Sequence, residues 1–125
     1  MKVHTILYVR DQEESKNFYS TLLNFEPILH VPGMTEFKLS DEHILGLMPE
    51  KGIINLLGDK IPDVMKGNGI PRVEIYFRVE NPAVFHKKAI ELGAKEISPL
   101  LKRNWGDDVA YSMDFDGHII AFSSL

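Results

Sequence analysis

The sequence predicts an α+β fold made of two βαβββ modules, whose curved mixed sheets enclose a cavity. One observation is an internal repeat, because residues 4–11 and 74–81 align at an offset of 70 (74 − 4). Both segments combine β-branched and aromatic residues and end in a polar pair, as strands do. The other observation is that each segment is followed by a helical pattern and then by three further strand candidates.

In the first module, Asp11 or Ser15 can cap a helix. The apolar side chains that would share one face of this helix are Phe18, Tyr19, Leu22 and Leu23. Strands are expected at residues 26–30, 36–39 and 44–48.

In the second module, Asn81 is a suitable N-cap and Pro82 suits the first helical position, while Gly93 suits the end of the helix. The apolar stripe of this helix comprises Phe85, Ala89, Ile90 and Leu92. Strands are expected at residues 95–98, 109–113 and 119–123.

Between the modules, residues 49–72 are rich in proline and glycine and predict a linker, with a short helical turn at 53–57. We expect a single domain over residues 1–125, with module 1 at about 1–50, the linker at about 51–71 and module 2 at about 72–125. The length of 125 residues suffices for one core and is too short for two independent ones.

Composition excludes several classes of function. The net charge of −4 gives no basic footprint for nucleic acid. The chain has no cysteine, so thiol catalysis, disulfides and thiolate metal sites are excluded. No apolar stretch approaches the ~20 residues of a membrane span, and no signal-peptide pattern precedes the first strand. We therefore expect a cytoplasmic protein without nucleic-acid or membrane partners.

Side chains alternate across a strand, and this separates a helix-packing face from a polar face. The apolar set expected against the helices is Leu7, Val9, Ile75, Phe77 and Val79. The opposite faces carry His4, Glu74 and Arg78 among Ile6, Tyr8 and Tyr76. Two such faces around a cavity have the general form of a small-molecule pocket.

Two stretches carry a family resemblance. The first is "HTILYVRDQEESKNFYSTLLNFEP" and the second is "WGDDVAYSMDFDGHIIAFSSL". Together, on an internal repeat, they resemble the vicinal oxygen chelate superfamily, also called the glyoxalase/bleomycin resistance protein/dioxygenase family. The resemblance implies the glyoxalase/bleomycin resistance fold, and the chain is closest in kind to the metal-free bleomycin-resistance-like members.

The resemblance also implies four positions for metal ligands, which fall on His4, near Gly46, on Glu74 and on Ala121. Catalytic members usually place Glu or His at the second position and Glu at the fourth. Only His4 and Glu74 carry ligand atoms here, and two protein ligands would hold a divalent ion weakly. We therefore expect no cofactor, with a divalent metal as the alternative. His4 and Glu74 could instead pair as an acid–base dyad.

The expected ligand-binding residues are His4, Met48, Tyr76, Arg78, Trp105, Tyr111 and Met113. Trp105 could stack on a planar ligand or simply cover the sheet edge. Arg78 could anchor an anion or form an ordinary salt bridge. Tyr111 needs a partner for its hydroxyl, and a ligand is one candidate. Met48 and Met113 could line the cavity or fill the core.

Other polar motifs favour structural roles. Asp114, Asp116 and Gly117 are expected to form the turn of the last hairpin. His43 and His118 are expected to face solvent, and His30 and His86 to lie on a strand end and a helix. For all four, a surface or hydrogen-bonded histidine is the favoured interpretation.

The function expected is that of a metal-free binding protein that sequesters or senses a small molecule, usually as a homodimer. The alternative is a metal-dependent glyoxalase-type lyase or isomerase, or an antibiotic-modifying transferase. An enzyme would be a lyase of the lactoylglutathione lyase type. A purely structural subunit has no positive sign in the sequence.

Overall fold

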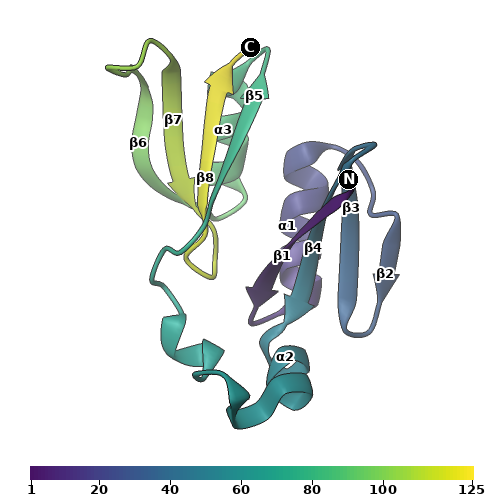
Figure 1. Ribbon diagram of the computed structural model, residues 1–125. Coiled ribbons are helices and arrows are strands. Elements are labelled where there is room, and N and C mark those ends of the chain that lie inside the picture. The colour runs from purple at the N-terminus through teal and green to yellow at the C-terminus, as the bar shows by residue number, and fades with distance from the viewer. The chain divides into compact units, whose positions relative to one another are not determined.

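The computed structural model describes all residues, 1–125, and divides into two compact units, Met1–Gly67 and Asn68–Leu125. Each unit contains one four-stranded mixed sheet and a helix between its first two strands. Figure 1 shows the repeated β-α-β-β-β order of the elements along the chain. The predicted α+β class and its two modules are therefore confirmed.

Unit 1 has the strand order β1-β4-β3-β2, in which β1 and β4 are parallel and the other neighbours antiparallel. Its strands and helices are β1 (Val3–Val9), α1 (Gln12–Leu23), β2 (Leu29–Val31), β3 (Met34–Ser40), β4 (His43–Pro49) and α2 (Glu50–Leu57). Two 3-10 turns follow, Gly58–Lys60 and Val64–Gly67.

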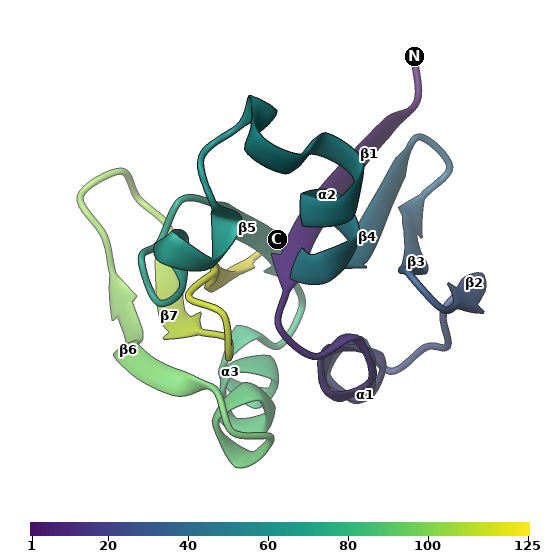
Figure 2. The same ribbon diagram turned by 90° about the horizontal axis from the view of Figure 1, so that it is seen from below.

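Helix α1 covers the core face of this sheet by packing on β4 and β3, and Figure 2 views the helix nearly end-on. It begins where the carboxylate of Asp11 accepts the backbone N–H of Glu14 at 2.9 Å. It ends at Asn24, whose positive φ of 61° an asparagine tolerates. The buried apolar residues of this core are Leu7, Val9, Phe18, Tyr19, Leu22, Phe37, Leu45 and Leu47.

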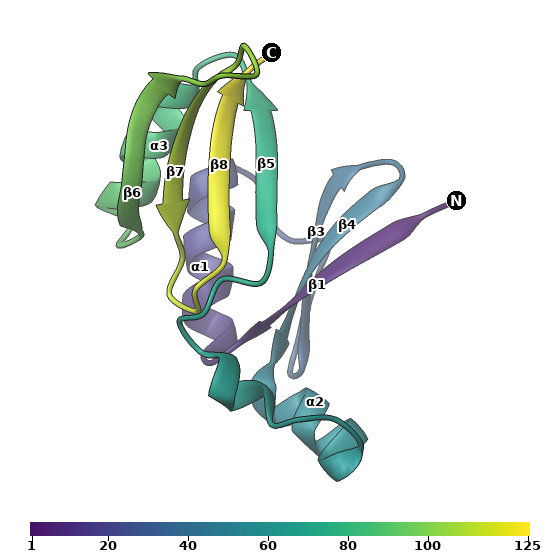
Figure 3. The same cartoon turned by 60° about the vertical axis from the view of Figure 1, so that its left-hand side comes forward.

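Unit 2 repeats the topology with the order β5-β8-β7-β6, in which β5 and β8 are parallel. Its elements are β5 (Glu74–Val79), α3 (Pro82–Glu91), β6 (Lys95–Lys102), β7 (Asp108–Met113) and β8 (Ile119–Ser124). Figure 3 shows the four strands side by side with α3 behind them.

Aromatic stacking joins α3 to its sheet. The ring of Phe122 lies 5.4 Å from that of Phe77 and 5.2 Å from that of Phe85 on α3. This contact identifies the face of Phe77 as the helix-packing face, as the alternation predicts. Asn81 occupies the N-cap position of α3, but its side chain makes no capping hydrogen bond.

Three boundaries differ from the sequence-based expectation. The linker holds a two-turn helix, α2, because Ile53 is buried and anchors it, where only a turn at 53–57 was expected. Strand β2 is limited to three residues, since its register with β3 begins only at Leu29. Strand β6 continues through Pro99 to Lys102, because register shifts in this edge strand accommodate the proline. No helix is long and apolar enough to cross a membrane.

The close approach of two backbone segments at Gly117 yields a stability prediction. Gly117 has φ +95°, and a Cβ there would lie 2.9 Å from backbone atoms of Gly69. Gly117→Ala should therefore lower the free energy of unfolding by at least about 2 kcal/mol, from backbone strain plus a clash. Urea denaturation measures this change. Gly33→Ala is the matched control, since Gly33 has φ +97° but nothing within 4 Å, and strain alone should cost about 1 kcal/mol. Equal losses in both variants would contradict the packing argument.

Candidate functional site

The face of the unit 2 sheet opposite α3 gathers most of the predicted ligand-binding residues. In register, Tyr76 on β5 pairs with Ala121 on β8, which pairs with Tyr111 on β7. Paired residues in a sheet point to the same side, so two tyrosines flank one alanine. The neighbouring rows are Glu74, Ile119 and Met113 on one side, and Arg78, Ser123 and Val109 on the other. We call these three rows the tyrosine face.

Asp107, in the β6–β7 loop, binds one residue from each of two rows of the tyrosine face, Tyr76 and Arg78. Its Oδ2 atom accepts the hydroxyl of Tyr76 at 2.7 Å and the Nη2 of Arg78 at 2.9 Å. Arg78 also donates from Nη1 to the carbonyl oxygen of Ser124 at 3.2 Å. Both bonds to Asp107 involve a charged partner, and such bonds are stronger than neutral ones. Arg78 is thus held in an ordinary salt bridge, one of the two roles that the sequence left open.

Trp105 stands at the tip of the same loop. Its indole Nε1–H points at the Tyr76 hydroxyl oxygen at 3.4 Å, and 56% of the residue is exposed. An exposed indole is costly to leave in water and is well suited to stacking. The loop therefore places an aromatic surface beside the Tyr76–Asp107–Arg78 network.

Arg103 anchors the other end of the loop and was not anticipated from the sequence. Its Nη2 donates to the Ser98 hydroxyl at 2.6 Å and to the carbonyl oxygen of Val109 at 2.8 Å. Its guanidinium carbon lies 5.0 Å from the centre of the Tyr111 ring, within cation–π range. The spacing of charged residues on both sides of Trp105 was the available signal for Arg103 and Asp107, but it does not reveal which groups they contact.

Tyr111 is the group whose ionisation the tyrosine face alters. Burial raises the pKa of its hydroxyl above the ordinary value of 10.0, and the negative charge of Glu74 raises it further. The nearby Arg103 guanidinium acts in the opposite direction. Tyr111 is therefore a neutral phenol at physiological pH, able to donate one hydrogen bond.

In unit 1, His4 lies on the face of β1 opposite α1 and lines an open hollow. Its Nδ1 is 3.1 Å from Oε2 of Glu36, which pairs in register with Gly46. The hollow has a volume of about 450 Å³ and is lined by Lys2, His4, Ile28, Glu36, Lys38, Asp41, Glu42 and Ile44. Met48 is half-buried, and its methyl group lies 3.4 Å from the position of a Cβ on Gly52 in α2.

The residues at the family's four metal positions do not fit a metal ion of that kind. At Gly46, a Cβ would lie 3.1 Å from Cγ1 of Ile6 and 3.4 Å from Sδ of Met34, so a longer side chain would have to displace them. Ala121 is completely buried and has no ligand atom. The Nδ1 of His4 is already paired with Glu36, and Glu74 alone supplies a free carboxylate. Closed and catalytic sites normally need three or more protein ligands.

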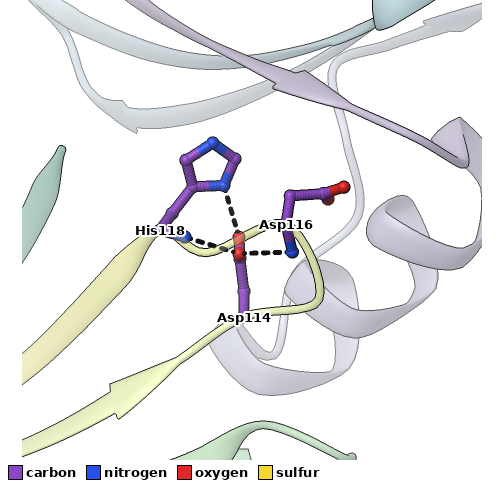
Figure 4. A group of neighbouring side chains, drawn as sticks. All are labelled: Asp114, Asp116 and His118. Carbon is purple, nitrogen blue, oxygen red and sulfur yellow. Dashed lines mark hydrogen bonds and ion pairs between the residues drawn. The ribbon is translucent and has the colours of Figure 1, made fainter. Parts of the chain in front are cut away.

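The Asp114–Gly117 segment forms a turn, as its sequence predicts. Oδ1 of Asp114 accepts the backbone N–H groups of Asp116 and His118, both at 2.9 Å (Figure 4). The Oδ2 atom lies 2.8 Å from Nδ1 of His118. Possible ligand atoms of Asp114, Asp116 and His118 lie within 4.8 Å of one another, but these bonds already account for the arrangement of the hairpin.

The expectation that His43 and His118 face solvent is wrong for His118, because its pairing with Asp114 leaves its side chain only 14% exposed. His43 is half-buried, with Nε2 2.8 Å from the Thr5 hydroxyl. His30 lies 2.8 Å from Glu13, and the buried His86 lies 2.8 Å from Glu96. All four histidines are thus hydrogen-bonded.

Both the sequence and the fold of this chain resemble those of known proteins. Residues 2–125 match the family model of the glyoxalase-like domain. A glyoxalase-related enzyme from Fulvimarina pelagi is 18% identical with a TM-score of 0.81, covering 100% of this chain and 88% of that one. A glyoxalase/bleomycin resistance protein/dioxygenase family enzyme from Burkholderia phytofirmans PsJN is 14% identical with a TM-score of 0.82, covering 97% and 95%. These likenesses concern the fold. A search of curated proteins found no match.

The raised pKa of Tyr111 predicts a late-titrating phenol. The 13C-labelled side chain of Tyr111, assigned by its absence in Tyr111→Phe, should ionise above pH 10 in the folded protein. Because the unfolded chain releases this proton first, the stabilisation is complete below about pH 10 and is lost as the pH rises toward the folded-state pKa. NMR titration of folded and urea-unfolded protein measures both effects. A Tyr111 signal that titrates at or below the unfolded value would contradict the assignment.

Proposed function

Because this chain belongs to the glyoxalase-like domain family, we propose that it binds a small, partly aromatic organic molecule on the tyrosine face without using a catalytic metal. The observation that carries the proposal is that Asp107 binds the Tyr76 hydroxyl, which also accepts the indole N–H of Trp105. Tyr111 lies on the same face, in register with Tyr76 across Ala121 and in contact with Arg103. Binding sites for small molecules typically combine aromatic surface with a few fixed polar groups.

The polar groups of this face are oriented before a ligand arrives. Asp107 holds both the Tyr76 hydroxyl and the Arg78 guanidinium, so neither side chain needs to lose much rotamer freedom on binding. Arg103 fixes the loop that carries Trp105 through bonds to Ser98 and Val109. A rigid aromatic site of this kind supports recognition of a flat or compact ligand.

Binding without metal catalysis is supported by the lack of ligand atoms at Gly46 and Ala121. A metal-dependent lyase of the lactoylglutathione lyase type, or an antibiotic-modifying transferase, would need at least one ligand besides His4 and Glu74. Substitution of His4 and Glu74 tests this second candidate, because both residues carry possible metal-ligand atoms.

The proposal includes three properties expected from the sequence and the family: a single domain over residues 1–125, a homodimer and a cytoplasmic location. Size-exclusion chromatography with light scattering tests the dimer. A mass near the 14.2 kDa of one chain, at concentrations from micromolar to millimolar, would contradict it.

Ligand binding should be visible through the single tryptophan. Titration with bleomycin and with a library of aromatic fragments should change Trp105 fluorescence for at least one compound. Asp107→Asn should weaken that compound about tenfold, since it removes the charge that orients Tyr76 and Arg78. Asp108→Asn is the matched control and should bind like the wild type. Calorimetric binding that leaves Trp105 fluorescence and the Asp107 variant unaffected would place the ligand elsewhere.

A metal titration tests the other half of the proposal. Nickel, zinc or manganese should change the melting temperature of the EDTA-treated protein by less than about 1 °C, since a ligand that binds only the folded state would raise it. A methylglyoxal hemithioacetal assay with each metal should give no turnover. A rise of several degrees that His4→Ala and Glu74→Gln both abolish would instead favour the metal-dependent enzyme.

A further inference from the structure

We propose that the open hollow of unit 1 binds a neutral, compact aliphatic molecule whose hydroxyl donates a hydrogen bond to Nε2 of His4. We call this cavity the His4 hollow. It shares no residue with the tyrosine face, so the inference goes beyond the proposed function and does not rest on it. Three features carry it: the volume of the hollow, the apolar residues that line it, and the tautomer of His4.

The His4 hollow gives a small molecule room. Its volume is about 450 Å³, and pockets for small molecules typically measure about 300–1,000 Å³. Two other hollows are smaller: one beside Gln12 and His30 holds about 220 Å³, and one beside Ile54 and Pro62 holds about 280 Å³. Of these three cavities, the His4 hollow is therefore the one that reaches the size of a ligand pocket.

Two isoleucines give the hollow its apolar surface. Ile44 on β4 pairs in register with His4 on β1 and with Lys38 on β3, so the three side chains share one side of the sheet. Ile28 is 59% exposed, and its backbone N–H donates to the carbonyl oxygen of Glu36 at 2.8 Å, which ties it to β3. No aromatic ring lines the hollow. Burial of these exposed aliphatic groups favours a ligand with a compact aliphatic body.

The charged side chains of the hollow carry both signs. Lys38 lies 3.0 Å from Asp41, so these two charges are paired. Lys2 and Glu42 line the same cavity with opposite charges. A charged ligand would thus meet like charges as well as opposite ones. Hydrogen bonding at His4 therefore distinguishes one ligand from another better than charge does.

The pairing of His4 with Glu36 fixes which ring nitrogen is free. Nδ1 of His4 lies 3.1 Å from Oε2 of Glu36. A carboxylate only accepts hydrogen bonds, so the proton of the neutral imidazole lies on Nδ1, and Nε2 keeps a lone pair. No hydrogen bond or ion pair uses this Nε2, and 46% of the side chain is exposed. A molecule in the hollow therefore meets an acceptor, which can bind a hydroxyl but not an ether oxygen.

The test compares two isomers that differ in hydrogen-bond donation. Cyclohexanol carries a hydroxyl, whereas the oxygen of methoxycyclopentane only accepts. We expect cyclohexanol to bind about fivefold more tightly, the effect of one ordinary hydrogen bond. NMR titration of 15N-labelled protein measures both affinities, and the shifts should centre on the backbone amides of His4, Glu36 and Ile44. Long-range 1H–15N spectra, recorded where they show the His4 ring to be neutral, should place its proton on Nδ1.

Variants assign the preference to the pair of His4 and Glu36. His4→Phe keeps a planar ring and removes the acceptor, so cyclohexanol should lose its advantage while the affinity for methoxycyclopentane stays the same. Glu36→Gln supplies an amide that can donate to Nδ1. It thereby allows the tautomer in which Nε2 donates to alcohol and ether alike, and the preference should fall. Glu14→Gln is the matched control and should keep the preference, because Glu14 is exposed on α1, which packs on the opposite face. Circular dichroism verifies that all three variants fold.

The outcomes separate this inference from the proposed function. Equal affinities of the two isomers, no binding of either, or a proton on Nε2 in the wild type would overturn it. A preference that His4→Phe leaves intact also overturns it. If cyclohexanol changes Trp105 fluorescence without shifting His4 and Glu36, it binds on the tyrosine face, and this inference fails while the proposed function stands. Failure of every aromatic fragment to bind would remove the proposed function and leave the His4 hollow unaffected.

Discussion

The two-residue alternation of a strand, combined with a single helix per sheet, is the constraint on which this structure depends. In each unit a helix connects the first strand to the second, at the far edge of the sheet. The chain then returns through antiparallel strands, so that the first and last strands pair in parallel, β1 with β4 and β5 with β8. The helix covers one face of its sheet, so the residues of the central strands that point to that face enter the core. The second face is buried at positions such as Ala121 and Ser123, and it is exposed at Glu74 and Arg78. His4 on β1, and Glu74 and Arg78 on β5, lie on those second faces.

On the unit 2 sheet, the second face is organised by one carboxylate. Asp107 comes from a loop, yet it ties together two side chains that lie two residues apart on β5. Because Arg103 fastens the same loop from the other side, Trp105 is presented from a segment with little freedom to move away. Hydrogen bonds and an ion pair therefore hold the side chains of this face in position, as apolar packing does on the face that contacts the helix. These bonds fix Tyr76 even though the neighbouring Trp105 is exposed.

The departure from the family's metal positions has a local physical basis. On β4, the absence of a side chain at Gly46 lets Ile6 and Met34 approach the backbone, while Glu36 on the adjacent strand pairs with His4. On β8, Ala121 is completely buried in register between two tyrosines, and its methyl group carries no ligand atom. Neither position supplies a ligand atom, which is the basis of the proposal that the protein binds its ligand without a catalytic metal.

The sequence by itself determined the class of fold, the repeat and the face on which the residues of β1 and β5 lie, because these follow from local periodicity. It identified Tyr76, Arg78, Trp105 and Tyr111, which the structure brings together on unit 2, and it placed His4, Met48 and Met113 on their strands. It did not reveal the contacts of Asp107 and Arg103, the pairing of His4 with Glu36, or the burial of His118. Those depend on which loop returns to which strand and on the register between non-adjacent segments, and only the tertiary structure decided them.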